Sequence, residues 1–337
     1  MSDAMTTTQE AATTAVSADM VRMVDAGTLI SIVVPVFNEE ESVLAFIKVV
    51  GPILEGTGAN WELVFVDDGS SDRTVDILLA QRTTVPQIKI VKLSRNFGKE
   101  AALAAGLDFA SGDMVAVMDV DMQDPPELLA QMIARWREGY DIAYGRRVQR
   151  DSDGFLKRLT AGRFYKLFNS ISDAPIPDNV GDFRLMDRSV VDALNKLPER
   201  VRFMKGLFAW VGFKSIAVDY ERPARLAGQT KFRYWRLWNF ALDGITSFST
   251  VPLRIWTYVG LLIALVSFVY GSYIIMRTVI FGVDVPGYAS LLVLILFLGG
   301  VQLMGLGIIG EYLGRVFYEV KQRPLYLAEK LYGFERD

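Results

Sequence analysis

The chain has 337 residues, of which 51 % are hydrophobic, so we expect a catalytic domain together with a membrane component. Lys and Arg together number 36 and Asp and Glu 39, and the resulting net charge of −3 argues against a dedicated nucleic-acid binder. The chain has no Cys and no His, which excludes a thiol nucleophile, a disulfide framework, an imidazole base and a His/Cys zinc site.

The first part of the chain predicts a polar tail followed by an α/β domain. Residues 1–28 are rich in Thr and Ala and lack the basic and apolar regions of a cleaved signal peptide, so a disordered tail is expected. Apolar runs then alternate with helical patterns. Strands are predicted at 29–35, 61–66, 88–93, 114–118 and 141–145, and helices at 41–50, 74–81, 99–110 and 127–138. This alternation predicts a Rossmann-like, mostly parallel sheet covered by helices on both faces.

Polar side chains follow three of the predicted strands at the points where the strands end. They are Asn38 and Glu39, Asp67 and Asp68, and Asp119, Asp121 and Gln123. Each set alone would also fit an ordinary connecting turn. Together they lie at the sheet edge where an open α/β sheet binds ligands, and closely spaced carboxylates there suit a hard divalent cation shared with substrate phosphates. The sequence therefore predicts a metal–diphosphate site that uses oxygen ligands.

Two uncharged runs dominate the C-terminal part. Ile255–Met276 and Tyr288–Gly310 are each long enough to cross a hydrocarbon core of about 30 Å. The connection between them carries only Arg277 and Asp284, whereas several basic residues flank the pair on the other side. The positive-inside rule therefore predicts a two-helix hairpin within 251–312, with the catalytic domain and both termini in the cytoplasm. Residues 313–337 are expected to form a cytoplasmic tail.

Two amphipathic segments precede the hairpin. Residues 155–171, inside the expected catalytic domain 29–232, and residues 233–250 each place apolar side chains on one helical stripe beside basic ones. Core helices of soluble proteins show the same period. The Trp and Arg residues directly ahead of a membrane span favour a position in the headgroup layer for the second segment. An active site held at a membrane surface indicates a lipid substrate.

Several motifs, taken together, resemble those of family 2 glycosyltransferases, which have the GT-A fold. They are PVFNEEES, DDGSSD, RNFGKE, DVDMQDPPE and GQTKFRYW, followed by the hairpin. The resemblance covers about Leu29 to the C-terminus and points to the polyisoprenyl-phosphate branch, which includes dolichol-phosphate mannosyltransferases and bactoprenol glucosyltransferases. It implies transfer of one sugar from a nucleotide sugar to a polyprenyl phosphate, with inversion, at the bacterial cytoplasmic membrane.

The resemblance also implies roles for individual residues. Those matched to the nucleotide-sugar pocket are Pro35, Phe37, Glu39, Val66, Asp68, Asp119, Val120 and Arg147, with Arg146 beside the last. Asp119, Asp121 and Gln123 correspond to the ligands of a Mg²⁺ or Mn²⁺ ion that would help the diphosphate leave. The residues expected to act in catalysis are Asp121, Asp182, Arg225 and Lys231. Arg225 and Lys231 match a phosphate-contacting pair, and attraction to lipid headgroups is the alternative explanation for them.

Asp182 lies in the motif VGDFR, where bactoprenol-type members carry an acid. Because a lipid phosphate is already anionic, we expect Asp182 to orient a substrate, with a general-base role as the alternative. The acid favours UDP-glucose as donor. The alternatives are a mannosyltransferase that uses GDP-mannose and a non-catalytic sugar-nucleotide-binding scaffold in the membrane. Glycines in the second span would permit close helix packing, which favours a homo-oligomer.

Overall fold

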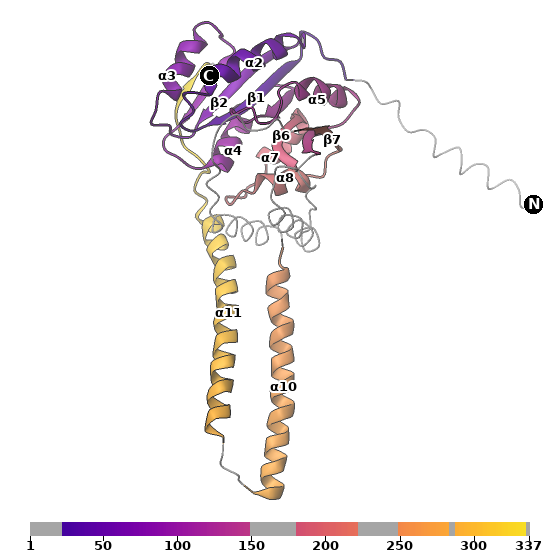
Figure 1. The fold of residues 1–337 in the computed structure, drawn as a ribbon, viewed down its shortest axis with the longest axis vertical. Helices are drawn as coiled ribbons and strands as arrows, with labels where there is room; N and C mark the ends of the chain where they lie inside the picture. The colour runs from indigo at the N-terminus through magenta and orange to yellow at the C-terminus, as the bar shows by residue number, and fades with distance from the viewer. Residues whose placement is uncertain (1–21, 149–179, 222–248, 283–286, 335–337) are drawn as a thin grey trace, which may run out of the picture.

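The computed structural model describes residues 22–148, 180–221, 249–282 and 287–334. In these ranges an α/β domain carries two long helices that extend from it side by side (Figure 1). This architecture confirms the predicted combination of an α/β domain and a two-helix hairpin. The interfacial segment 155–171, residues 233–248, Arg225, Lys231 and most of the expected N-terminal tail lie outside the described residues.

Within the described residues, eight strands form one sheet in the order β7-β5-β6-β4-β1-β2-β3-β8. Their bounds are Leu29–Val36 (β1), Asn60–Asp67 (β2), Ile88–Leu93 (β3), Met114–Val117 (β4), Ile142–Arg147 (β5), Val180–Asp187 (β6), Ser215–Tyr220 (β7) and Ala328–Tyr332 (β8). The strands β3, β2, β1 and β4 are parallel, so their carboxyl ends share one edge. Strand β6 runs antiparallel between β4 and β5, which brings its first residues to the same edge.

The central strands are apolar because both faces of the sheet are covered. In β1, Ile30, Ile32 and Val34 point into one core with helices α2 (Val43–Glu55), α3 (Thr74–Arg82) and α5 (Leu128–Arg137). Val33 points into a second core with α4 (Lys99–Phe109), α7 (Arg188–Asn195) and α8 (Met204–Trp210). The period of two in β1 therefore divides its side chains between two helical layers.

Helix α4 packs on the sheet at a glycine. A Cβ placed on Gly106 would lie 2.1 Å from Cγ1 of Val33, much closer than a van der Waals contact permits. The helix therefore approaches β1 more closely than a residue with a side chain would allow. This close packing fixes the start of α4, which faces the carboxyl ends of the strands.

The helices of the hairpin are longer than the apolar runs that predicted them. Helix α10 covers Val251–Phe281 and α11 covers Tyr288–Lys321, and both are long and apolar enough to cross a membrane. Their apolar side chains are largely exposed, as at Phe268 and Val279, which are 74 % and 80 % exposed. In a soluble domain such surfaces would be buried, so the exposure fits helices that lie in lipid.

Both ends of the described chain differ from the expected tails. Arg22, inside the expected tail 1–28, forms ion pairs with Asp141 and Asp187 at 2.7 and 3.3 Å. After α11, the chain returns to the sheet and adds β8 to the exposed edge of β3 in antiparallel pairing. The expected tail 313–337 thus begins inside α11 and contains a strand. Two of the five residues of β8 are charged, and the strand lacks the apolar run that identifies a buried strand, because an edge strand needs no such run.

Candidate active site

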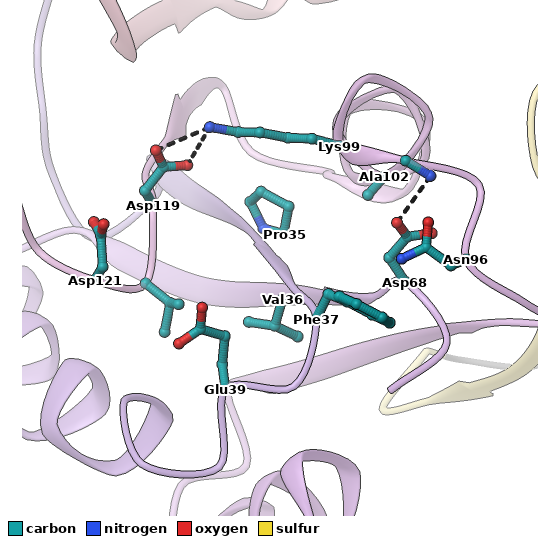
Figure 2. Close-up of a pocket in the computed structure, with 12 residues that line it drawn as sticks. Pro35, Val36, Phe37, Glu39, Asp68, Asn96, Lys99, Ala102, Asp119 and Asp121 are labelled. Atoms are coloured by element: carbon teal, nitrogen blue, oxygen red, sulfur yellow. Dashed lines mark hydrogen bonds and ion pairs between the residues drawn. The ribbon is translucent and has the colours of Figure 1, made fainter. Parts of the chain in front are cut away.

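A cavity of about 430 Å³ opens at the carboxyl ends of β1, β2 and β4 (Figure 2). Its lining residues are Pro35, Val36, Phe37, Glu39, Asp68, Asn96, Gly98, Lys99, Ala102, Asp119, Val120 and Asp121. The structure therefore brings together six of the eight residues expected to bind the nucleotide sugar. The other two do not line this cavity: Val66 is fully buried in β2, and Arg147 contacts Tyr220 and Asp124.

The turn after β1 presents an exposed aromatic ring. Phe37 is 46 % exposed, although it follows a strand whose apolar residues are buried. The next residue, Asn38, has a left-handed φ of 56°, and its backbone N–H donates to Ser70 Oγ at 2.9 Å. The N–H of Glu39 donates to Thr74 Oγ1 at 2.9 Å. These contacts hold the turn against the start of α3, so Phe37 is placed at the cavity where a base can stack on its ring.

Asp68 holds the loop that precedes α4 at the cavity. Its two carboxylate oxygens accept the backbone N–H groups of Phe97 and Gly98 at 2.7 and 2.9 Å. The neighbouring Gly69 has a φ of 76°, and a Cβ there would lie 2.6 Å from the carbonyl carbon of Arg95. Asp68 and Gly69 therefore clamp the loop before α4 onto the end of β2. This structural role accompanies the predicted contact with base or ribose.

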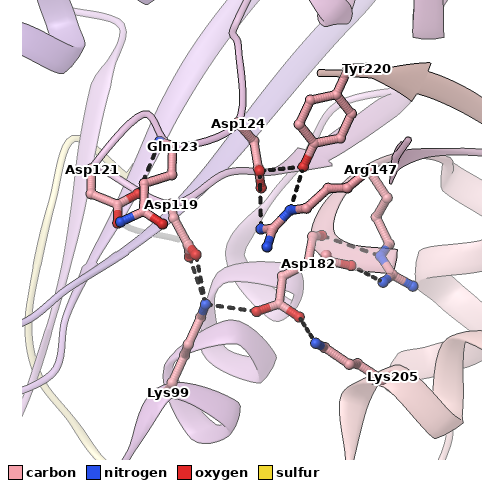
Figure 3. A network of polar contacts seen from close by, with 11 residues as sticks. Lys99, Asp119, Asp121, Gln123, Asp124, Arg147, Asp182, Lys205 and Tyr220 are labelled. Carbon is pink, nitrogen blue, oxygen red and sulfur yellow. Dashed lines mark hydrogen bonds and ion pairs between the residues drawn. The ribbon is translucent and has the colours of Figure 1, made fainter. Parts of the chain in front are cut away.

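The predicted metal ligands lie on one tight turn after β4. The N–H of Met122 donates to the carbonyl of Asp119 at 3.3 Å, and Met122 has a left-handed φ of 48°. Asp121 is exposed, and its Oδ1 accepts the N–H of Gln123 at 3.2 Å. Figure 3 shows Asp119, Asp121 and Gln123 around this turn. Their oxygen atoms are of the kind that Mg²⁺ and Mn²⁺ prefer.

The donor set fits a cation that shares its coordination with a substrate. Among the described residues, no group of three or more Asp, Glu, His or Cys is placed to hold a metal ion by itself. Two carboxylates and one amide would leave several coordination positions for phosphate oxygens and water. Mg²⁺ is commonly held in this way, by one or two carboxylates plus substrate phosphates. The turn therefore suits an ion that arrives with a diphosphate.

A lysine connects this turn to Asp182. Lys99 Nζ lies 2.7 Å from Asp119 Oδ1, 2.9 Å from Asp119 Oδ2 and 2.7 Å from Asp182 Oδ2 (Figure 3). Lys205 Nζ lies 3.9 Å from the other Asp182 oxygen. Burial opposes ionisation of Asp182, but Lys205 and Lys99 outweigh it and lower the pKa of this carboxyl. Burial raises the pKa of Asp119, and Lys99 partly offsets that effect.

The backbone that carries Asp182 is held by a buried arginine. Arg184 donates to the carbonyls of Asp182 and Gly181 at 3.2 and 2.9 Å, and its guanidinium lies 3.6 Å from the ring centre of Phe208. Burial lowers the pKa of Arg184 to about 10, so it remains charged at neutral pH. This arginine links α8 to the start of β6 and thereby orients Asp182.

Arg147 and Arg146 have different surroundings. Arg147 donates to the hydroxyl of Tyr220 at 2.9 Å and to Asp124 at 3.2 Å, and the Tyr220 hydroxyl also donates to Asp124. Burial and Asp124 raise the pKa of Tyr220 to about 12. Arg146 instead pairs with the exposed Asp219 at 2.6 and 2.8 Å. Of the two arginines, Arg147 lies closer to Asp182, because its Nη2 would be 3.6 Å from a Cβ placed on the preceding residue, Gly181.

Sequence reasoning missed most of the cations around Asp182. Lys99 belongs to the RNFGKE motif but was given no role from the sequence, and Lys205 was not expected at the site. The signal for Lys99 was its position directly after the RNFG turn, at the start of a helix that faces the strand ends. Nothing local marks Lys205, because α8 is a short helix more than 20 residues after Asp182.

Comparison with known proteins identifies the family. Residues 31–194 match the model of glycosyl transferase family 2, and residues 251–316 match the GtrB C-terminal hairpin. An uncharacterized glycosyltransferase of Synechocystis is 54 % identical over 306 residues, which cover 91 % of this chain and 96 % of that protein. The chain belongs to glycosyl transferase family 2. This confirms the predicted fold class of a GT-A domain with a C-terminal hairpin, and the expected glycosyltransferase activity.

Two further relatives carry more specific names. The bactoprenol glucosyl transferase of Shigella phage SfII is 54 % identical over 301 residues, covering 89 % of this chain and 97 % of that protein. The prophage bactoprenol glucosyl transferase homolog of Escherichia coli is 52 % identical over 302 residues, covering 90 % of this chain and 99 % of that protein.

The solved structures are less similar to this chain in sequence than these relatives are. The mannosyl-3-phosphoglycerate synthase of Rubrobacter xylanophilus has a TM-score of 0.45 and 21 % identity, over 64 % of this chain and 71 % of that one. The glucosyl-3-phosphoglycerate synthase of Mycobacterium tuberculosis, in complex with Mn²⁺, UDP-glucose and phosphoglyceric acid, has a TM-score of 0.44 and 20 % identity, over 66 % and 78 % of the two chains. At this level of similarity neither structure decides the substrate.

Proposed function

We propose that this glycosyltransferase transfers one glucose residue from UDP-glucose to the phosphate of a polyprenyl phosphate, undecaprenyl phosphate in bacteria. The observation that carries the proposal is the identity of 52–54 % to proteins named bactoprenol glucosyl transferases, over about 90 % of the chain. The hairpin supports a lipid acceptor, because it would hold the catalytic domain at a bilayer surface.

The cavity is the proposed donor site. Phe37 offers a ring on which the base can stack, and Glu39 and Asp68 offer acceptors for base and ribose hydrogen bonds. Asp119, Asp121 and Gln123 would hold a divalent cation against the diphosphate. When bound, such an ion supplies positive charge that stabilises the departing diphosphate. Arg147, whose guanidinium lies close to Gly181, would contact a phosphate or the transferred sugar.

Asp182 acts as an orienting carboxylate in this proposal. Lys99 and Lys205 lower its pKa, so the group is ionised at neutral pH but is a poor proton acceptor. A phosphate nucleophile is already anionic and needs no strong base. The acceptor oxygen would attack the anomeric carbon from the face opposite the diphosphate, which inverts that centre without a covalent enzyme intermediate. Arg225 and Lys231, outside the described residues, are proposed to bind the acceptor and donor phosphates.

The proposed location is the bacterial cytoplasmic membrane, with the catalytic domain and both termini in the cytoplasm. Basic residues around the start of α10 and the end of α11, the ends nearer the catalytic domain, support this orientation. A reporter fused after Asp337 should be active on the cytoplasmic side only, and activity on the opposite side would contradict the topology. A homo-oligomer remains a prediction from the glycines of α11, and its test is the mass of the purified protein in detergent.

The central experiment is a transfer assay with purified protein, polyprenyl phosphate and radiolabelled UDP-glucose or GDP-mannose. We expect a labelled lipid from UDP-glucose in the presence of Mg²⁺ or Mn²⁺, and loss of product on chelation. Labelled product from GDP-mannose alone would favour the mannosyltransferase alternative. Binding of UDP-glucose without any transfer would favour the scaffold alternative.

A further inference from the structure

The ammonium of Lys99 contacts the carboxylate of Asp119, which is one of the proposed ligands of the divalent cation. The residue opens α4, and its side chain crosses the cavity to reach Asp119 (Figure 2). The ammonium contacts both oxygens of Asp119, at 2.7 and 2.9 Å, and one oxygen of Asp182 at 2.7 Å. The side chains of Lys99 and Asp119 are 45 % and 39 % exposed, so a ligand in the cavity can reach the pair.

The backbone of Lys99 is fixed, whereas its side chain can move. Asp68 binds the N–H groups of Phe97 and Gly98, and Gly98 has a φ of 98° at the start of the helix. These contacts hold the loop against the end of β2. Four methylene groups separate the ammonium from this anchored backbone, so a change of rotamer can displace the charge while the helix stays in place.

A lysine in this position competes with a metal ion. A divalent cation bound to Asp119 would need the same carboxylate oxygens that now accept hydrogen bonds from Lys99. Two positive charges held within a few ångströms of each other repel strongly in a partly buried site. Asp119 can therefore bind the metal only if Lys99 withdraws. Asp182 is already paired with Lys205 as well, so it can keep a partner whichever way Lys99 moves.

The diphosphate of the donor would offer a new partner for the displaced ammonium of Lys99. The donor phosphates would lie between the metal turn and the start of α4, where their oxygens can accept from an ammonium. We propose that Lys99 neutralises Asp119 in the donor-free enzyme and transfers to a phosphate oxygen of the donor when Asp119 takes up the divalent cation. This inference rests on the proposed function, because it assumes a metal-bound diphosphate in the cavity.

The exchange makes metal and nucleotide binding interdependent. Without nucleotide, the ion must displace Lys99 from Asp119 and leave that charge without a new partner. With nucleotide, the displaced ammonium gains a phosphate contact, so the metal binds more tightly. By linkage, the metal strengthens nucleotide binding by the same factor. Removal of the lysine charge should tighten nucleotide-free metal binding and reduce the coupling.

The test is a titration of the full-length protein in detergent with Mn²⁺, in which free Mn²⁺ is measured by electron paramagnetic resonance with and without UDP. In the wild type we expect UDP to tighten Mn²⁺ binding at least tenfold. In Lys99→Met, we expect nucleotide-free binding to tighten about tenfold and the UDP effect to fall below threefold. Lys99→Arg keeps the charge and should retain most of the coupling.

Lys205→Met is the matched control, because it removes a cation that lies 3.9 Å from Asp182 and, among the described residues, forms no ion pair with Asp119. It should change nucleotide-free Mn²⁺ binding by less than threefold. Equal Mn²⁺ affinities and an equal UDP effect in wild type and Lys99→Met overturn the exchange. If Lys205→Met tightens nucleotide-free Mn²⁺ binding as much as Lys99→Met does, the exchange is also overturned, because the loss of any nearby positive charge would then explain the result. Absence of Mn²⁺ binding by the wild type with UDP overturns both the exchange and the proposed metal site.

Discussion

The burial of Glu100 should make the stability of the protein depend on pH, and this dependence can be assigned to one carboxyl group. It lies beside Lys99 on α4, and its Oε2 accepts the backbone N–H of Met204, the first residue of α8, at 3.1 Å. Burial raises the pKa of Glu100 from its ordinary 4.5 to about 7, and the negative charge of Asp182 adds to this effect. The folded protein therefore binds a proton here more tightly than the unfolded chain does.

The sign and size of the effect of Glu100 on the free energy of unfolding follow from proton linkage. The pKa of Glu100 is higher in the folded protein than in the unfolded chain. Its contribution to the free energy of unfolding is therefore fully present below about pH 4.5 and is lost as the pH rises through 7. The difference between a pKa of 4.5 in the unfolded chain and one of about 7 in the folded protein corresponds to about 3 kcal/mol. Glu100→Gln stays neutral and can still accept from Met204. The variant should therefore gain about 2–3 kcal/mol over the wild type between pH 5 and pH 8.

The assay is thermal unfolding of both proteins in detergent, followed by tryptophan fluorescence at pH 5 and pH 8. The difference in Tm between variant and wild type should grow by roughly 4–12 °C over this range. The chain has no His, so the usual titrating side chain of this pH range is absent from the comparison. Glu41→Gln, at an exposed position, should not change the pH dependence. A Tm difference between Glu100→Gln and wild type that is the same at both pH values would refute the reasoning.

Three further predictions concern the metal turn, the sheet and the C-terminal segment. Asp121→Ala should lower metal-dependent transfer on the order of 100-fold without changing the Tm, because the side chain is exposed; full activity would contradict its role as a ligand. Gly106→Ala should destabilise the fold by about 1–3 kcal/mol through overpacking, whereas Gly51→Ala, with open space around it, should not; similar Tm values for both variants would show that α4 can move. Tyr326→Phe removes a hydrogen bond of 2.8 Å to Asp108 and should lower stability by about 1 kcal/mol, measured by urea unfolding.

The strand ends of the site could be predicted because their signals are local. An apolar run followed by polar residues marks both the strand and its carboxyl end, and parallel pairing then collects these ends at one edge. Pro35, Phe37, Glu39, Asp119 and Asp121 all reach the cavity in this way. The hairpin could be predicted for the same reason, since length and apolar content are properties of the segment itself.

The partners of Asp182 could not be predicted, because they depend on how distant elements pack. Lys99 and Asp182 are 83 residues apart and meet only because β6 inserts antiparallel beside β4. Lys205 reaches the same carboxylate from α8, whose position is set by the apolar contacts of Met204, Leu207 and Phe208. Neither β6 nor α8 was predicted from the sequence, and periodicity does not give the order of strands in a sheet.

The return of β8 to the sheet limits how the catalytic domain can move relative to the hairpin. The chain passes into α10 after β7, at one edge of the sheet, and comes back from α11 to β8 at the other edge. Near the domain, Glu319 of α11 accepts the N–H groups of Arg200 and Val201 at 2.8 and 3.2 Å. These hydrogen bonds and the pairing of β8 with β3 join the end of α11 to the domain at more than one point. Rotation of the domain about the end of α11 would have to break these hydrogen bonds.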